Sequence, residues 1–73
     1  MAERKLKADI TGRVWKIIAQ PGTRIGEEEP IILIESMKME IPVLSPAAGT
    51  VKSILVGEGD DVSEGQDVVI MEI

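Results

Sequence analysis

The chain has 73 residues, with eight Lys and Arg against thirteen Asp and Glu, a formal net charge of -5, and neither cysteine nor histidine. These totals predict a single domain over residues 1–73, near the lower size limit for one apolar core, and they argue against nucleic-acid binding, which needs clustered cations. Without His or Cys the chain lacks the commonest zinc ligands, the usual general base and the Ser-His and Cys-His nucleophiles, so we expect no catalytic and no metal-binding residues.

Short segments rich in Val and Ile, separated by turn-forming residues every few positions, predict an all-β fold without helices. The aliphatic runs are far shorter than the roughly 20 residues of a membrane helix, and the start of the chain lacks the apolar region of a signal peptide. We therefore expect a cytoplasmic protein with no membrane partner. In chain order, the eight expected strands cover Leu6–Ile10, Arg13–Ile18, Thr23–Ile25, Pro30–Ser36, Met39–Leu44, Thr50–Val56, Asp60–Val62 and Gln66–Ile73.

The sequence repeats itself with a shift of 37 residues. Identical residues recur at this spacing in the pairs Gly12/Gly49, Val14/Val51, Ile17/Ile54, Gly22/Gly59, Glu27/Glu64 and Glu35/Glu72. Such a duplication predicts two halves of four strands each, related by a pseudo-two-fold axis, with two small sheets packed across an aliphatic core. Trp15, the sole aromatic residue, aligns with Lys52, so we expect it to lie partly exposed on an outer face.

The repeat places Lys38 at the junction of the two halves, because position 38 corresponds to position 1 and position 36 to position 73. The strands Pro30–Ser36 and Met39–Leu44 should therefore form a hairpin with Met37 and Lys38 at its tip, at the end opposite the termini. Met-Lys offers none of the Asn-Gly or Asp-Gly chemistry that a two-residue turn prefers. Departures from sequence rules of this kind are typical of functional sites.

An exposed lysine is protonated at neutral pH and is a poor nucleophile. Its neighbours Glu35 and Glu40 are anionic, and neither an apolar pocket nor a nearby cation that would lower its pKa is evident. Met37 and Met39 place flexible apolar side chains where solvent would otherwise be met, which suits a surface contacted by more than one partner. We therefore interpret Lys38 as a substrate for modification by another protein. The alternative is an ordinary turn lysine whose neighbours pack inward.

The motif ESMKME at residues 35–40, preceded by PGTRIGEEEPIILI and followed after four residues by the segment SPAAGTV, is similar to the biotinyl/lipoyl carrier domains. The similarity covers about Ile10 to Ile73, and Met-Lys-Met resembles the biotinyl branch, above all the small stand-alone biotin/lipoyl attachment proteins. This resemblance implies a flattened eight-stranded barrel of two four-stranded antiparallel sheets. Residues 15–22 contain no inserted loop, so the domain resembles the type without a protruding thumb.

The resemblance also implies the role of each hairpin residue. Lys38 would carry biotin through an amide, Met37 and Met39 would flank it as recognition residues, and Glu35, Ser36 and Glu40 would form the surrounding hairpin. A serine at position 36 is more frequent in lipoyl domains, so lipoate on Lys38 is the alternative cofactor.

The same resemblance implies a carrier that is not itself an enzyme. A biotin protein ligase would modify Lys38, and the arm would carry CO2 between biotin carboxylase and carboxyltransferase sites, with tethering that gives local concentrations on the order of millimolar. Two alternatives stay open: a lipoyl carrier for acyl or aminomethyl transfer, and an unmodified barrel that acts as an interaction module. The acidic clusters at residues 27–29 and 58–61 are expected to be solvated loops rather than metal sites.

Overall fold

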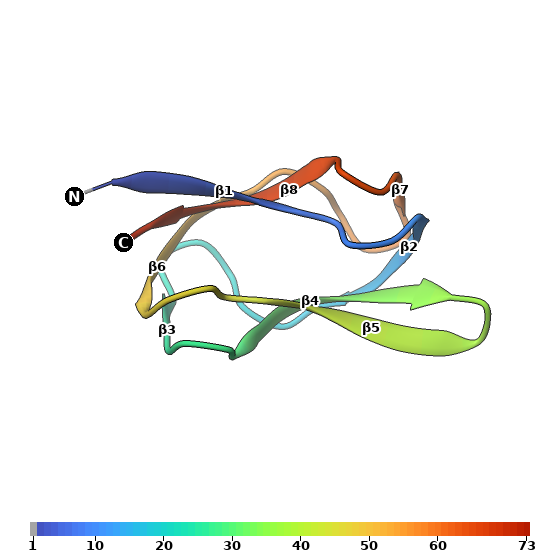
Figure 1. The fold of residues 1–73 in the computed structure, drawn as a ribbon, viewed down its shortest axis with the longest axis horizontal. Helices are drawn as coiled ribbons and strands as arrows, with labels where there is room; N and C mark the ends of the chain where they lie inside the picture. Colours follow the sequence, from blue (N-terminus) through green and yellow to red (C-terminus); the bar gives the residue numbers. More distant parts are fainter. Residues whose placement is uncertain (1) are drawn as a thin grey trace.

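The computed structural model describes residues 2–73, which form eight β-strands and no helix (Figure 1). Two four-stranded antiparallel sheets face each other, so the predicted all-β architecture is confirmed. One sheet, ordered β1-β8-β6-β3, contains both chain ends and is called the terminal sheet here; the other, ordered β5-β4-β2-β7, is called the hairpin sheet. The strands are β1 Glu3–Lys7, β2 Gly12–Ile17, β3 Arg24–Ile25, β4 Pro30–Ser36, β5 Met39–Leu44, β6 Gly49–Ile54, β7 Asp61–Val62 and β8 Asp67–Glu72. No helix capable of crossing a membrane is found among these described residues.

The two halves of the chain have the same backbone structure. A shift of 37 residues carries β1 to β4 onto β5 to β8, and so exchanges the two sheets. Details repeat as well: Gly22 and Gly59 have φ angles of 91° and 90°. The Gly22 N–H donates to the Val51 carbonyl over 2.7 Å, and the Gly59 N–H donates to the Val14 carbonyl over 2.8 Å. The pseudo-two-fold repeat is therefore a property of the fold as well as of the sequence.

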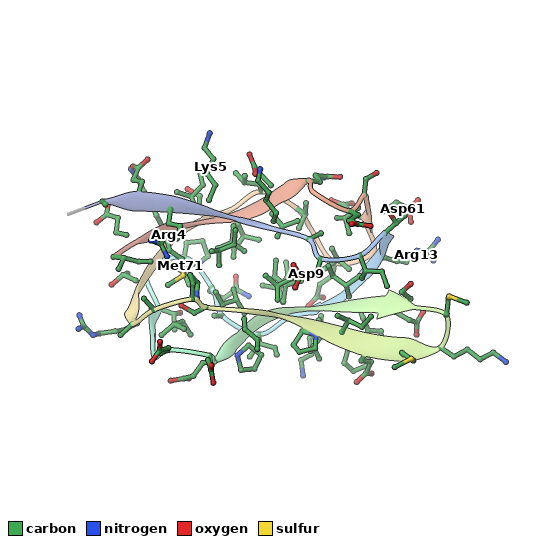
Figure 2. The ribbon with its side chains drawn as sticks, viewed as in Figure 1. Arg4, Lys5, Asp9, Arg13, Asp61 and Met71 are labelled. Carbon is green, nitrogen blue, oxygen red and sulfur yellow. The ribbon has the colours of Figure 1, made fainter. Side chains whose placement is uncertain are left out.

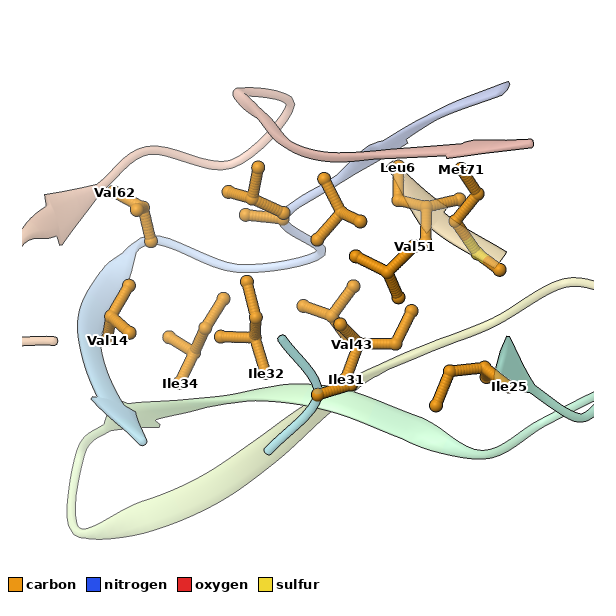
Figure 3. Packing of buried hydrophobic residues seen from close by; sticks show 14 residues of the cluster. Leu6, Val14, Ile25, Ile31, Ile32, Ile34, Val43, Val51, Val62 and Met71 are labelled. Carbon is orange, nitrogen blue, oxygen red and sulfur yellow. The ribbon is translucent and has the colours of Figure 1, made fainter. Parts of the chain in front are cut away.

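An aliphatic core fills the space between the sheets (Figure 3). Both sheets supply it from equivalent positions, with Ile31, Ile32 and Ile34 on β4 and Val68, Val69 and Met71 on β8, all fully buried. The cluster comprises Leu6, Ala8, Val14, Ala19, Ile25, Ile31, Ile32, Ile34, Val43, Val51, Val62, Val68, Val69 and Met71. Interiors packed in this way are stiff, so the strands are a firm support for the loops at both ends.

The first strand lies earlier in the chain than its sequence predicts. β1 spans Glu3–Lys7 rather than Leu6–Ile10. The hairpin strands Pro30–Ser36 and Met39–Leu44 are as predicted, and the boundaries of the other strands differ by at most two residues. As an edge strand β1 tolerates charged residues, and only Leu6 of its five side chains is buried. The strand ends at Lys7 because the chain must cross from the terminal sheet to the hairpin sheet before β2 begins at Gly12.

Two equivalent glycines allow strands to approach closely at each end of the barrel. A Cβ atom on Gly12 would lie 2.4 Å from the Glu35 carbonyl oxygen, and one on Gly49 would lie 2.4 Å from the Glu72 carbonyl oxygen. Both distances are too short for any side chain, so these positions require glycine. The contact at Gly12 holds the start of β2 against the end of β4, directly below the hairpin tip.

Candidate functional site

The β4–β5 hairpin ends in a two-residue turn made of Met37 and Lys38. Ser36 pairs with Met39, and the φ angles of Met37 and Lys38 are 51° and 66°. Two positive φ angles in succession are the mark of a type I′ turn, whose twist matches that of the flanking strands. The sequence correctly places this tip, but its residue types give no hint of the left-handed backbone. That conformation costs L-residues roughly 1–2 kcal/mol each, and glycine or asparagine would avoid most of that cost.

The tip stands clear of the rest of the molecule. Met37 is 90% and Met39 63% exposed, and Lys38 is exposed between them. Within residues 2–73, the Lys38 ammonium forms no ion pair, although Glu35 and Glu40 lie on the strands that lead to it. The domain measures 36 × 17 × 17 Å, and the hairpin lies at one end of its long axis (Figure 1).

The chain ends lie at the opposite pole, as expected. Ala2 and Ile73 form two backbone hydrogen bonds, 3.0 and 2.8 Å long, next to the start of β1 and the end of β8. Under the 37-residue shift, Ala2 corresponds to Met39 and Ile73 to Ser36. The turn that carries Lys38 therefore occupies the place that the two termini occupy in the other half.

Ser36 anchors the hairpin, a role that its sequence context does not indicate. Its hydroxyl donates a hydrogen bond of 3.1 Å to the Thr11 carbonyl. The Thr11 hydroxyl in turn accepts a hydrogen bond of 2.9 Å from the Glu64 N–H. The tip end of the hairpin is thus connected to two loops distant in the sequence, which limits its movement.

A shallow groove runs beside the tip and is the part of the site that sequence analysis misses. It is lined on one side by Ser36 and Met37 and on the other by Arg13, Asp61 and residues of the neighbouring loops. The Arg13 guanidinium lies 3.4 Å from the Asp61 carboxylate, and Figure 2 shows both at the hairpin end of the molecule. Only tertiary structure brings these segments together, so no local signal could have found the groove.

The acidic clusters form turns. The Glu29 carboxylate accepts a hydrogen bond of 2.9 Å from the Gly26 N–H, and the Asp60 carboxylate accepts one of 2.8 Å from the Gly57 N–H. The Glu58 carboxylate accepts a bond of 3.1 Å from the Ile17 N–H. No group of side chains suited to hold a metal ion occurs in the part of the chain that the structure describes. Glu29 and Asp60 therefore accept hydrogen bonds within their own turns, and Glu58 accepts one from strand β2.

The acidic groups with shifted pKa values lie on the terminal sheet. A hydrogen bond from Lys52 lowers the pKa of Glu3 below its ordinary 4.5, and the same contact raises the pKa of Lys52 above 10.5. A hydrogen bond from Lys7 lowers the pKa of Asp67 below 3.8. All of these groups lie at the surface, so the contacts tune the charge of that face without forming a reactive centre.

Known proteins are similar to this chain in sequence and in fold. The family model described as "Biotin-requiring enzyme" matches residues 6–72. The "Biotinylated protein TB7.3 homolog" of Mycobacterium leprae is 38% identical over 71 residues, which are 97% of this chain and 99% of that protein. The "Biotin/lipoyl attachment protein" of Bacillus subtilis is 38% identical over 64 residues, which are 88% of this chain and 85% of that protein.

A solved structure gives the same result for the fold. The urea carboxylase of Kluyveromyces lactis contains a region that superposes with a TM-score of 0.93 and 33% identity, over 99% of this chain and 6% of the larger one. Other relatives include both pyruvate carboxylases and dihydrolipoyllysine-residue acyltransferase components.

Proposed function

The chain belongs to the biotin/lipoyl domain family, and from this premise we propose that it is a biotin carrier whose acceptor is the Nζ amine of Lys38. One observation supports the choice of residue above all. Lys38 stands at the apex of a two-residue turn, between two exposed methionines, at the pole farthest from the termini.

The residues around Lys38 fit a covalently attached cofactor with a long arm. No carboxylate within residues 2–73 holds the ammonium in an ion pair, so the side chain is available to a modifying enzyme. Met37 and Met39 are flexible and apolar, and they offer contact area that can adapt to more than one partner. Nothing at the tip could activate the amine, so the activating chemistry must come from outside.

Attachment then needs a biotin protein ligase as partner. The ligase supplies the cofactor as an acyl-adenylate and takes a proton from Lys38. The free Nζ electron pair attacks the acyl carbon, the C–N bond forms, the C–O bond to phosphate breaks, and AMP leaves with that electron pair. This chain contributes the position of the amine, which is fixed by the turn and by the hydrogen bond from Ser36 to Thr11.

After attachment, the domain acts as the stiff base of a mobile arm. Biotin, when bound, supplies a ring nitrogen that can accept and release a carboxyl group. The β scaffold keeps the root of the arm at the pole, and tethering keeps the local concentration near a partner site on the order of millimolar. Biotin carboxylase and carboxyltransferase sites are the proposed partners, a choice supported by relatives named biotin carboxyl carrier protein and pyruvate carboxylase.

The second candidate is a lipoyl carrier for acyl or aminomethyl transfer. It is favoured by Ser36 and by relatives named for dihydrolipoyllysine residues, whereas Met37 and Met39 favour biotin. An unmodified interaction module is the third candidate. The biotin carrier and the lipoyl carrier differ in the mass of the acyl group on Lys38 Nζ, so mass spectrometry distinguishes them.

The test is tandem mass spectrometry of the peptide that contains Lys38, isolated from the native host. We expect one biotinyl group on Nζ, and a Lys38→Arg variant that keeps the charge but is not captured by avidin. Lys16→Arg, at an exposed lysine of β2, is the matched control and should be modified normally. A lipoyl group, or full cellular function with Lys38→Arg, would reject the biotin carrier.

A further inference from the structure

The duplication allows the outer faces of the two sheets to be compared position by position. On the hairpin sheet, Leu33 of β4 pairs on one side with Pro42 and on the other side lies opposite the bulge that contains Trp15. In the next row, Pro30 pairs with Leu44. All five point away from the core, because Leu33 alternates with the buried Ile32 and Ile34, and the bulge between Pro30 and Ile32 brings Pro30 to the same side. We call these five residues the apolar face; Trp15 is 49% and Leu44 45% exposed. The exposed Lys16, which pairs with Leu33, lies beside them on this side.

The terminal sheet has charged residues at four of these five places and an apolar residue, Ile70, at the fifth. A shift of 37 residues replaces Trp15, Pro30, Leu33, Pro42 and Leu44 by Lys52, Asp67, Ile70, Lys5 and Lys7. Lys7 lies 2.6 Å from Asp67, and Lys52 pairs with Glu3. The fold therefore accepts a solvated, charged surface on this backbone, and nothing in the core requires the apolar side chains of the hairpin sheet.

A row of two carboxylates separates the apolar face from the hairpin tip. Glu35 and Glu40 lie directly opposite each other, and no cation within residues 2–73 lies at ion-pair distance from either. Like charges placed opposite each other on adjacent strands are destabilising. In the terminal sheet, Lys52 neutralises the equivalent carboxylates Glu3 and Glu72. In the hairpin sheet Trp15 takes the place of Lys52. Arg13 pairs with Glu35 in the strand register, but its guanidinium lies 3.4 Å from the Asp61 carboxylate, so among the described residues Glu35 and Glu40 have no ion pair.

An exposed Trp in an apolar patch is the composition of a protein interface. The unpaired carboxylates of Glu35 and Glu40 favour a partner surface that is cationic opposite them, because its cations would neutralise the two negative charges. Leu33 lies three residues before the end of β4, so the apolar face begins about 10 Å from the tip at roughly 3.3 Å per strand residue. An enzyme that acylates Nζ needs the tip itself, whereas an enzyme that acts on the finished arm can bind at this distance.

We propose that the apolar face and the Glu35–Glu40 row form the docking surface for the enzyme that carboxylates the arm, through an apolar partner surface bordered by Lys or Arg. This inference rests on the proposed biotin carrier function. Such an enzyme binds bicarbonate and a nucleoside triphosphate, both anions, so the entrance to its active site must be cationic, whichever acyl acceptor is used later. The cations then meet the carboxylates next to Lys38, and the apolar face fixes the orientation.

A fluorine label on Trp15 tests the docking directly. The chain has one tryptophan, so 5-fluorotryptophan gives a single 19F resonance. The biotinylated chain, checked by intact mass, is titrated with a purified biotin carboxylase subunit whose bicarbonate-dependent ATP hydrolysis it stimulates. We expect the resonance to shift and broaden. The matched control combines Trp15→Lys with Lys52→Trp, which moves the label to the terminal sheet without changing composition, and its resonance should not respond.

Kinetics give the second test. Trp15→Lys and, separately, Leu44→Lys introduce the residues that the terminal sheet has at these places, and each should raise the KM for the biotinylated chain by about tenfold or more. The kcat should change little, and the KM of the unmodified chain for the biotin protein ligase should stay the same. Two exposed positions keep the test valid if one variant folds poorly.

Several outcomes would overturn the inference. The KM could be unchanged in both variants, or the ligase KM could rise as much, which would assign the face to the attachment enzyme. A 19F shift on concentrating the chain alone would assign it to a second copy. Lack of biotin on native Lys38 would instead reject the proposed function, so the two failures can be told apart.

Discussion

The left-handed turn at the tip predicts that replacing Met37 by Asn stabilises the protein. Met37 has a φ angle of 51°, a region that costs an ordinary L-residue roughly 1–2 kcal/mol but that asparagine adopts readily. If about half of this cost is recovered, Met37→Asn gains about 0.5–1 kcal/mol of unfolding free energy. For a domain of this size, each kcal/mol shifts Tm by about 4–8 °C. The expected increase is therefore about 2–8 °C, measured by circular dichroism on the unmodified chain.

Met37→Leu is the control, because leucine keeps the apolar contact and meets the same steric cost. It should leave Tm within the error of the measurement and keep the rate of biotinylation by a biotin protein ligase. Met37→Asn should slow biotinylation, because a side chain that is 90% exposed and apolar is lost from the contact surface. An unchanged or lower Tm for Met37→Asn, or an equal gain for Met37→Leu, would refute the reasoning from turn strain.

Three further predictions concern the scaffold. Gly49→Ala places a Cβ atom 2.4 Å from the Glu72 carbonyl oxygen and should destabilise the fold by about 1–3 kcal/mol in urea denaturation; a cost near zero would contradict the close approach. Glu28→Gly, at a φ of 64° where the other half has glycine, should stabilise by about 0.5–1 kcal/mol, and a loss would show that the Glu28 side chain matters. Because Lys52 lowers the pKa of Glu3, the unfolding free energy from this pair is full above about pH 4.5 and falls as the carboxylate is protonated. Lys52→Gln should reduce this decrease of the unfolding free energy at acid pH. An unchanged dependence of the unfolding free energy on pH would disprove the coupling between Lys52 and Glu3.

The periodicity of the sequence predicts the architecture well because duplicated strands bury the same positions twice. The hairpin and the pole of Lys38 follow from the same repeat. β1 is misplaced because local pattern cannot show where the chain crosses between sheets, and an edge strand with one buried residue gives little apolar signal. The positive φ angles of Met37 and Lys38 are contrary to residue preference and become visible only in the backbone.

The surroundings of the site are less accessible to sequence analysis. The hydrogen bond from Ser36 to Thr11 joins residues 25 positions apart. The contrast between the two outer faces requires strand register, because Trp15 shares a surface with Leu33 and Pro42 only through bulges and pairings across three strands. The prediction that Trp15 is partly exposed is confirmed, but its neighbours could not be named from the sequence alone.

The pairing of Ala2 with Ile73 makes the terminal pole a geometric copy of the hairpin pole. Two residues in a left-handed turn would be long enough to join these ends, since two residues bridge the equivalent gap between Ser36 and Met39. A ring closed by Met-Lys would then offer an acceptor amine at each end of its 36 Å axis. Such a double-ended rod could present cofactors in opposite directions, and a cut at either turn would give a permuted chain with the same barrel.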